Sequence, residues 1–194
     1  MKVAVVQFPG SNADWDALHA VRDVLGADAW YAFHKETSLG DADAVVIPGG
    51  FSYGDYLRAG AIAGFSPIDT AIQEFAGRGG PVLGICNGFQ ILTKLGLLPP
   101  GSLIHNESGR FQCQWSGLER KVGANPFLNL LPRSFEVPVA HAEGRFVTAT
   151  PEEAELYKVQ GLAALTYSDN INGSSAQIAG LQDASGRVLG LMPH

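Results

Sequence analysis

The sequence has few charged residues, and basic residues are the scarcer kind. Of its 194 residues, 13 are Lys or Arg and 19 are Asp or Glu, which gives a formal net charge of −6. Binding to nucleic acid depends on clustered Lys and Arg, and the basic residues here are scattered along the chain. We therefore expect no nucleic-acid partner.

Long apolar runs are also missing. No segment approaches the roughly 20 apolar residues of a membrane-spanning helix. The opening apolar run over 1–6 is too short for a signal peptide and is followed by Gln7 and Pro9. Hydrophobic residues nevertheless make up 46% of the chain, enough to build a core. We expect a cytoplasmic protein, with 1–194 forming a single globular domain and no contact with a membrane.

Cysteine is scarce, since only Cys86 and Cys113 occur. Two widely separated cysteines make a poor disulfide framework and favour a reducing compartment. We expect no metal site. The phosphate-binding pattern G-x-x-x-x-G-K-[ST] is absent as well, so we expect no ATP site of that kind on this chain.

Strand and helix patterns alternate in the first half of the sequence. Val- and Ile-rich runs at 2–6, 44–47 and 82–85 are each followed by a glycine-bearing turn, which is typical of strands buried on both faces of a parallel sheet. Helical spacing occurs at 13–25 and 58–76. The alternation predicts an α/β fold with a doubly wound, mostly parallel central sheet.

The second half changes character. Short extended runs separated by Gly, Pro, Asn and Ser predict antiparallel additions to the sheet, at 111–115, 135–139, 145–149 and 162–167. Only 152–158 is predicted to be helical there, and 187–192 forms a last strand that ends near His194. For the first helix, Asn12 is the expected N-cap and Gly26 the expected C-cap.

Cys86 lies between a predicted strand and a predicted helix that runs to Leu95. Gly84 and Gly88 flank it in the pattern G-x-C-x-G. Small neighbours permit the sharp turn that exposes a nucleophile above a sheet, and the helix N-terminus is expected to lower the thiol pKa. The alternative, a small buried apolar cysteine, suits Cys113 better, because Cys113 has neither flanking glycine.

With this elbow, the sequence resembles the class I, or triad, glutamine amidotransferases, and its form G-x-C-N-G-F-Q resembles the PurQ branch. That branch is the glutaminase subunit of phosphoribosylformylglycinamidine synthase. Further matching segments follow in the family's order over nearly the whole chain, at 7–12, 47–55, 138–141, 170–174 and 192–194. The resemblance implies a flavodoxin-like fold and the hydrolysis of glutamine to glutamate and ammonia.

The resemblance also implies roles for particular residues. Cys86 is the expected nucleophile, forming a γ-glutamyl thioester, and His194 the expected acid and base. The backbone N–H groups of Gly50 and Asn87 are expected to form the oxyanion hole. From the residues alone, the Pro-Gly-Gly turn that contains Gly50 could equally be a plain turn, and a terminal histidine a frayed end.

Several other residues are candidates for binding. Gln90 lies one helical turn after Cys86 and is expected to contact glutamine, although a capping role is equally open. Phe51, Asn170 and Asn172 are also expected to contact the substrate, and the alternative for the two asparagines is a simple turn. His141 matches a family motif near the active site but is not the triad histidine; we expect it behind the catalytic groups or at an interface.

One departure from the family concerns the end of the chain. The family motif reads P-H-P-E, in which the glutamate orients the histidine, and a helix usually follows. The sequence stops at His194. The resemblance therefore predicts an intact protein that extends past His194, carries this glutamate and has a C-terminal helix.

The resemblance further implies partners. Formylglycinamide ribonucleotide, ATP, glutamine and water would give formylglycinamidine ribonucleotide, ADP, phosphate and glutamate, with ATP and magnesium bound by a separate PurL-type synthetase subunit. A small PurS-type subunit commonly bridges the two. Tyr53 and Arg58 belong to residue types enriched at interfaces and are predicted to dock the synthetase, a solvated loop being the alternative.

Two other functions stay open from the sequence. One is a hydrolase with the same cysteine elbow, of the peptidase or DJ-1 kind, which would need no glutamine side chain. The other is a non-catalytic glutamine-sensing scaffold subunit, suggested by the missing glutamate.

Overall fold

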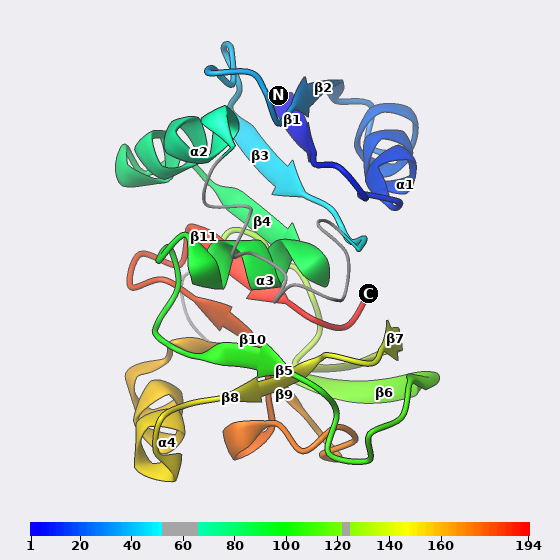
Figure 1. The fold of residues 1–194 in the computed structure, drawn as a ribbon, viewed down its shortest axis with the longest axis vertical. Coiled ribbons are helices and arrows are strands. Elements are labelled where there is room, and N and C mark those ends of the chain that lie inside the picture. Colours follow the sequence, from blue (N-terminus) through cyan, green and yellow to red (C-terminus); the bar gives the residue numbers. More distant parts are fainter. Residues whose placement is uncertain (52–65, 122–124) are drawn as a thin grey trace.

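A nine-stranded mixed sheet forms the centre of the computed structural model, which describes residues 1–51, 66–121 and 125–194 (Figure 1). The strand order is β2-β1-β3-β4-β11-β10-β9-β6-β7. The first five strands run parallel: β1 (Lys2–Gln7), β2 (Asp28–Phe33), β3 (Ala44–Ile47), β4 (Val82–Ile85) and β11 (Val188–Leu191). The predicted parallel core is confirmed.

Both faces of the parallel half are covered by helices. These are α1 (Asp14–His19), a π-helical turn that continues it (Ala20–Val24), α2 (Pro67–Gly77) and α3 (Asn87–Lys94). Val6 of β1 belongs to the apolar cluster that includes Ile72 of α2. Its neighbour Val5 belongs to the opposite cluster, with Leu18 of α1. Because successive side chains of a strand point to opposite faces, this division confirms the doubly wound fold.

The predicted helix boundaries need three corrections. The N-cap of α1 is Ala13 rather than Asn12. The loop before α1 is tied to the loop after β3, where the Ala13 N–H donates to the Gly49 carbonyl at 3.2 Å, so the helix starts later. The C-cap of the π-helical turn is Leu25, and the predicted C-cap Gly26 is the next residue, with a φ of +66°. In the second predicted helix, Ser66 is extended and caps a helix that begins only at Pro67; residues 58–65 lie outside the described residues.

The second half adds antiparallel strands to the sheet, as predicted. They are β10 (Ile178–Gln182), β9 (Ala163–Tyr167), β6 (Gln112–Arg120) and β7 (Ser134–His141). The helix α4 (Pro151–Gln160) packs beside them. The prediction for 145–149 was wrong in one respect: β8 (Arg145–Val147) leaves the main sheet and pairs with β5 (Ser102–Ile104). A turn after His141 redirects the chain, where the Gly144 N–H donates to the side chain of Asn106.

Two strands of the main sheet were not predicted, β2 and β10. β2 contains no Val or Ile, and because it lies at the edge of the sheet most of its residues are only partly buried. β10 is interrupted by Gly180 and has an irregular register with β9. Neither strand therefore has the continuous run of Val and Ile from which β1, β3 and β4 were predicted.

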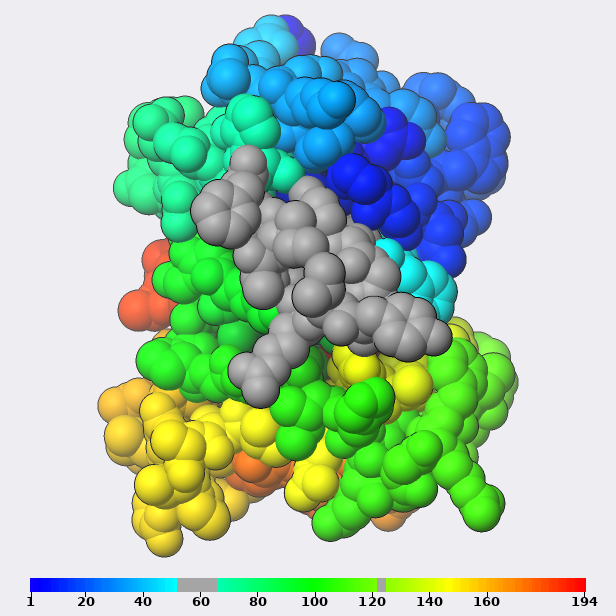
Figure 2. Space-filling model, in the orientation of Figure 1, coloured from blue at the N-terminus to red at the C-terminus, as the bar shows by residue number. Residues whose placement is uncertain are grey.

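The parallel strands end along one edge of the sheet. The ends of β3 and β4 and the C-terminus lie close together in Figure 1. Figure 2 shows the same face in space-filling form, with the blue N-terminal residues at one end of the molecule and the yellow and orange residues of the antiparallel half at the other. In open parallel sheets, ligands bind where the carboxyl ends of strands meet, so this edge is the place to seek a site. Within the described ranges, no helix is long and apolar enough to cross a membrane.

Candidate active site

The loops that follow β1 and β3 meet at the carboxyl edge of the sheet. Ser11 and Gly50 form an isolated antiparallel bridge, and the Phe51 N–H donates to the Gly10 carbonyl at 2.9 Å. A side chain at Gly50 would place its Cβ 2.8 Å from the Gly10 oxygen. The close approach of the two loops therefore requires glycine at position 50.

Cys86 occupies a strained turn between β4 and α3. Its backbone has φ 52° and ψ −107°, a conformation that L-residues rarely adopt. Its N–H donates to the Leu191 carbonyl of β11 at 2.8 Å, and its carbonyl accepts the Phe89 N–H at 3.0 Å. These bonds hold both sides of the turn, so the half-buried thiol has a fixed place at the start of α3.

The two glycines that flank Cys86 are required by packing. A Cβ at Gly88 would lie 2.1 Å from the carbonyl oxygen of Ile47 in β3. At Gly84 it would lie 2.6 Å from the oxygen of Gly88. α3 can therefore begin directly against β3 and β4 only because neither position has a side chain. The elbow predicted from G-x-C-x-G is present.

His194 reaches Cys86 because β11 lies beside β4. Leu191 is in register with Ile85, the residue before Cys86. A methyl group at Gly49 would lie 3.4 Å from Cβ of Cys86 and 3.8 Å from Nε2 of His194, so both side chains border the same small space. The His194 N–H donates to the Pro138 carbonyl at 3.0 Å, which fixes the end of the described chain against β7.

Burial dominates the electrostatics of this pair. It raises the pKa of the Cys86 thiol, and the Asn87 N–H opposes that shift only in part. The predicted lowering of this pKa by the helix N-terminus is therefore wrong in its net direction. Desolvation lowers the pKa of the His194 imidazole, opposed by the charge of Asp16, although His194 as a whole is exposed. Near neutral pH the pair is an uncharged thiol and an uncharged imidazole.

The predicted oxyanion-hole residues lie around Cys86. Asn87 is buried and begins α3, and its N–H acts on the Cys86 sulfur. Gly50 follows Gly49, which borders both Cys86 and His194. In the bridge between Ser11 and Gly50, the N–H that donates across to the loop after β1 belongs to Phe51. Because neighbouring N–H groups of an extended chain point in opposite directions, the Gly50 N–H points away from that loop. Their use as oxyanion donors stays a prediction.

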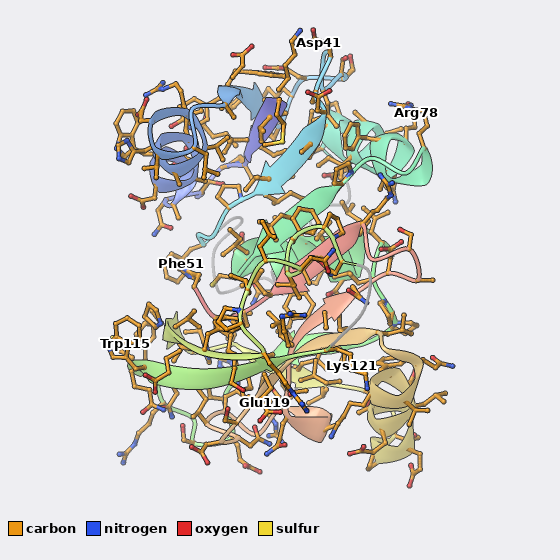
Figure 3. All side chains as sticks on the ribbon, turned by 180° about the vertical axis from the view of Figure 1, so that it is seen from behind. Asp41, Phe51, Arg78, Trp115, Glu119 and Lys121 are labelled. Atoms are coloured by element: carbon orange, nitrogen blue, oxygen red, sulfur yellow. The ribbon has the colours of Figure 1, made fainter. Side chains whose placement is uncertain are left out.

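The predicted substrate-binding residues have different surroundings. Gln90 accepts a hydrogen bond from the Asn87 side chain at 2.8 Å and donates to the Glu143 carbonyl at 3.2 Å. Phe51 is exposed beside Gly50 (Figure 3). The amide of Asn170 holds its own loop by donating to the Ser174 carbonyl, whereas the amide of Asn172 donates to the Gly144 carbonyl of a distant turn. Contact of any of these side chains with glutamine stays a prediction.

His141, which the sequence placed behind the catalytic groups or at an interface, forms a polar group with Asn106, which the sequence did not mark. His141 is buried, and its Nδ1 lies 3.0 Å from Oδ1 of Asn106. Desolvation lowers the pKa of His141 to about 4, and the nearby His194 adds to the lowering. No sequence pattern identifies Asn106, because it lies in a loop far from His141 along the chain.

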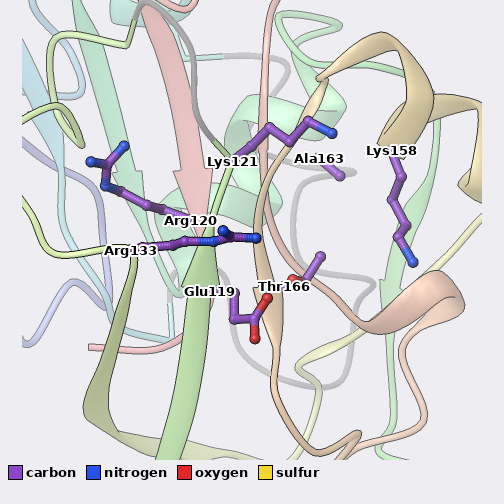
Figure 4. Close-up of a pocket in the computed structure, with 7 residues that line it drawn as sticks. All are labelled: Glu119, Arg120, Lys121, Arg133, Lys158, Ala163 and Thr166. Atoms are coloured by element: carbon purple, nitrogen blue, oxygen red, sulfur yellow. The ribbon is translucent and has the colours of Figure 1, made fainter.

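Other parts of the structure do not belong to this site. A cavity of about 370 Å³ lies in the antiparallel half and contains none of the predicted catalytic residues (Figure 4). Its lining consists of Glu119, Arg120, Lys121, Arg133, Lys158, Ala163 and Thr166. Tyr53 and Arg58, the predicted docking residues, lie outside the described residues. Among the residues that are described, no cluster of His, Cys, Asp or Glu is arranged to hold a metal ion.

Comparison with known proteins identifies the family. The family model of the CobB/CobQ-like glutamine amidotransferase domain matches residues 1–194. The chain belongs to this family. It is 47% identical to phosphoribosylformylglycinamidine synthase subunit PurQ of Methanosarcina mazei and to that of Salinibacter ruber, over 100% of this chain and 88% and 86% of the relatives.

Solved structures give the same result for the fold. The structure of PurLQS from Thermotoga maritima contains a chain that matches with a TM-score of 0.88 and 40% identity, over 100% of this chain and 86% of that one. A glutamine amidotransferase from the same organism matches with a TM-score of 0.64 at 19% identity, over 100% of this chain and 75% of that one. The fold is that of the class I glutamine amidotransferases.

The backbone strain at Cys86 can be tested by substitution. At an ordinary position, glycine is about 0.5–1 kcal/mol less stable than alanine. At φ 52° glycine avoids strain of order 1–3 kcal/mol that alanine retains. We therefore expect Cys86→Gly to unfold with a higher urea midpoint than Cys86→Ala, by about 1 kcal/mol in the free energy of unfolding.

Cys113 provides the matched control, because it lies in β6, away from any strained turn. Its side chain is exposed, so the interpretation of Cys113 as a buried apolar cysteine was wrong. There the order should reverse, with Cys113→Gly less stable than Cys113→Ala. If glycine is the less stable substitution at both positions, Cys86 stores no strain.

The low pKa of His141 predicts a pH-dependent stability. Between pH 6.5 and about 4 the unfolded chain binds a proton at His141 that the folded protein does not, so stability falls as the pH falls. The difference of pKa corresponds to about 3 kcal/mol. Compared with the non-titrating His141→Gln, the wild type should lose about that much more free energy of unfolding between pH 7 and pH 4.

Asp69 also titrates in this pH range, which is why the wild type has to be compared with the His141→Gln variant. Burial raises its pKa to about 6, so on acidification the folded state gains protons there and is stabilised over nearly the same range. This opposite contribution is common to wild type and His141→Gln and cancels in the difference. Parallel stability curves for the two proteins would show that His141 titrates normally when folded.

Proposed function

We propose that this chain is the glutaminase subunit of phosphoribosylformylglycinamidine synthase, with 1–194 as one amidotransferase domain. The observation that supports this proposal most directly is the position of Cys86, which lies in a strained turn and borders the same small space as His194 at the carboxyl edge of the sheet. The PurQ relatives, which align with all of this chain, support the choice of reaction. The family match argues against a peptidase or DJ-1-like hydrolase.

The first half of the reaction forms a thioester. Since the resting thiol is protonated, His194 takes the thiol proton as the sulfur attacks the amide carbon of glutamine. The oxygen of the tetrahedral intermediate accepts hydrogen bonds from the N–H groups of Asn87 and Gly50. His194 then gives its proton to the leaving nitrogen, and ammonia departs from the γ-glutamyl thioester on Cys86.

The second half hydrolyses this thioester. The now neutral His194 removes a proton from water, whose oxygen attacks the acyl carbon. The same oxyanion donors stabilise the second tetrahedral intermediate. Its collapse restores the Cys86 thiol, with the proton returned by His194, and releases glutamate. The lowered pKa of His194 keeps the imidazole neutral and able to act as a base at both steps.

The ammonia is used by a partner. The chain from Thermotoga maritima comes from a structure titled PurLQS, and we propose that this chain likewise assembles with a PurL-type synthetase subunit and a PurS-type subunit. Glutamine is its own substrate, and ATP and magnesium are assigned to the synthetase subunit. The reaction belongs to purine biosynthesis, and we place it in the cytoplasm.

Removing the nucleophile should separate the two sources of nitrogen. In the complex with its synthetase, Cys86→Ala should abolish glutamine-dependent synthesis and leave ammonia-dependent synthesis near the wild-type rate, because only the thioester step is lost. Both rates can be measured as product formed with glutamine or with an ammonium salt.

Labelling separates this function from its rivals. The glutamine analogue 6-diazo-5-oxo-norleucine should label the wild type and fail to label Cys86→Ala, with Cys113→Ala as the control that retains labelling. A peptidase or a glutamine-sensing scaffold should not be labelled at all. Full glutamine-dependent turnover by Cys86→Ala would exclude Cys86 as the nucleophile.

A further inference from the structure

The turn at 141–144, which starts at the last residue of β7, is bonded to two residues of the candidate glutaminase site. Gln90 of α3 donates to the Glu143 carbonyl at 3.2 Å, which joins the turn to the helix that begins after Cys86. On the opposite side, the His194 N–H is bonded to Pro138, three residues before His141 on β7. The turn is therefore bonded to α3 and continues the strand that holds His194.

A third connection comes from Asn172. Its amide donates to the Gly144 carbonyl at 2.8 Å and lies 3.5 Å from the hydroxyl of Tyr167. Tyr167 is fully buried; burial is the main cause of its raised pKa, and the proximity of Cys86 adds to it. The turn is thus hydrogen-bonded both to Gln90 of α3 and to Asn172, which lies beside Tyr167.

The side chain of Asn106 fixes the orientation of His141. The Asn106 Nδ2 donates to two carbonyls, those of Arg110 at 2.9 Å and His141 at 2.8 Å. Its Oδ1 must therefore be the acceptor that faces His141 Nδ1 at 3.0 Å, and it also accepts the Gly144 N–H. The His141 proton consequently resides on Nδ1, and Nε2 of the neutral ring carries a lone pair.

Among the residues that the structure describes, none provides a partner for that lone pair. Nε2 of His141 is one of the few fully buried side-chain polar atoms that the described residues leave without a hydrogen bond, although only 5% of His141 is exposed. Leaving a buried acceptor without a donor destabilises the folded protein. Such a group in an otherwise well-bonded network indicates that its partner arrives with a ligand.

We propose that Nε2 of His141 accepts a hydrogen bond from an N–H group of glutamine bound in the catalytic site. This inference rests on the proposed function, which supplies the substrate. Glutamine offers two such donors, the side-chain amide that becomes ammonia and the α-ammonium group. An imidazole that stays neutral can hold either one without giving it a proton, and ammonia has to stay unprotonated to act as a nucleophile in the synthetase.

Two substitutions distinguish this role from a structural one. Asn at position 141 can keep a donor near the position of Nδ1, and so the contact with Asn106, but places no acceptor at Nε2. Gln reaches the position of Nε2 with its carbonyl oxygen and gives up the contact with Asn106. The measurement is glutamate release from glutamine by each variant in the complete synthase complex, with ammonia-dependent synthesis as the control for assembly.

If His141 accepts a hydrogen bond from glutamine, His141→Asn should lower kcat/KM for glutamine about ten-fold or more, and His141→Gln should retain most of the activity. A fall in kcat would assign the contact to the reacting amide, and a rise in KM alone to the α-ammonium group. Ammonia-dependent synthesis should be unchanged in both variants.

The reverse order, with His141→Asn active and His141→Gln impaired, would overturn the proposal, because only the Asn106 contact would then matter. Equal activity of both variants and the wild type would overturn it as well. A failure of the proposed function would give a different result. The wild type itself would then not be labelled by 6-diazo-5-oxo-norleucine and would release no glutamate, and neither result would depend on the residue at position 141.

Discussion

The turn at Cys86 is the constraint on which the site depends. The chain has to pass from β4 into α3 within one residue, at a φ of 52° that is unfavourable for any side chain. It is held there by the bond from its N–H to Leu191 and by the approach of α3 to β3, where only glycine fits at position 88. Contacts with the neighbouring strands thus offset the strain of this turn. They also fix the position of the sulfur above the sheet.

The same contacts bring the remaining groups to that point. Because β11 pairs with β4 in parallel, the residues after Leu191 emerge beside Cys86, and His194 arrives from there. The burial that this packing causes keeps both groups neutral at rest. In the proposed mechanism the thiol therefore passes its proton to the imidazole during attack, whereas the low pKa expected for a helix N-terminus had suggested a preformed thiolate.

The parallel core, most of the antiparallel strands and the elbow could be predicted, because each depends on local patterns of apolar residues and glycine. The strand β2 and the start of α1 could not, since β2 lies at the sheet edge without Val or Ile and α1 is shifted by the contact between Ala13 and Gly49. The net pKa shift of Cys86 was missed because burial is a property of the packed structure. Asn106 and the tautomer of His141 depend on a contact between distant loops that no spacing in the sequence reveals.

The central claim is that Cys86 forms a covalent acyl intermediate with glutamine, and acid quenching of the complex during turnover tests it most directly. Mass spectrometry of the digested chain should find the peptide that contains Cys86 carrying one glutamyl group, and the modification should be absent when glutamine is omitted. A glutaminase that turns over normally with this peptide unmodified, or with the glutamyl group on Cys113, would contradict the account.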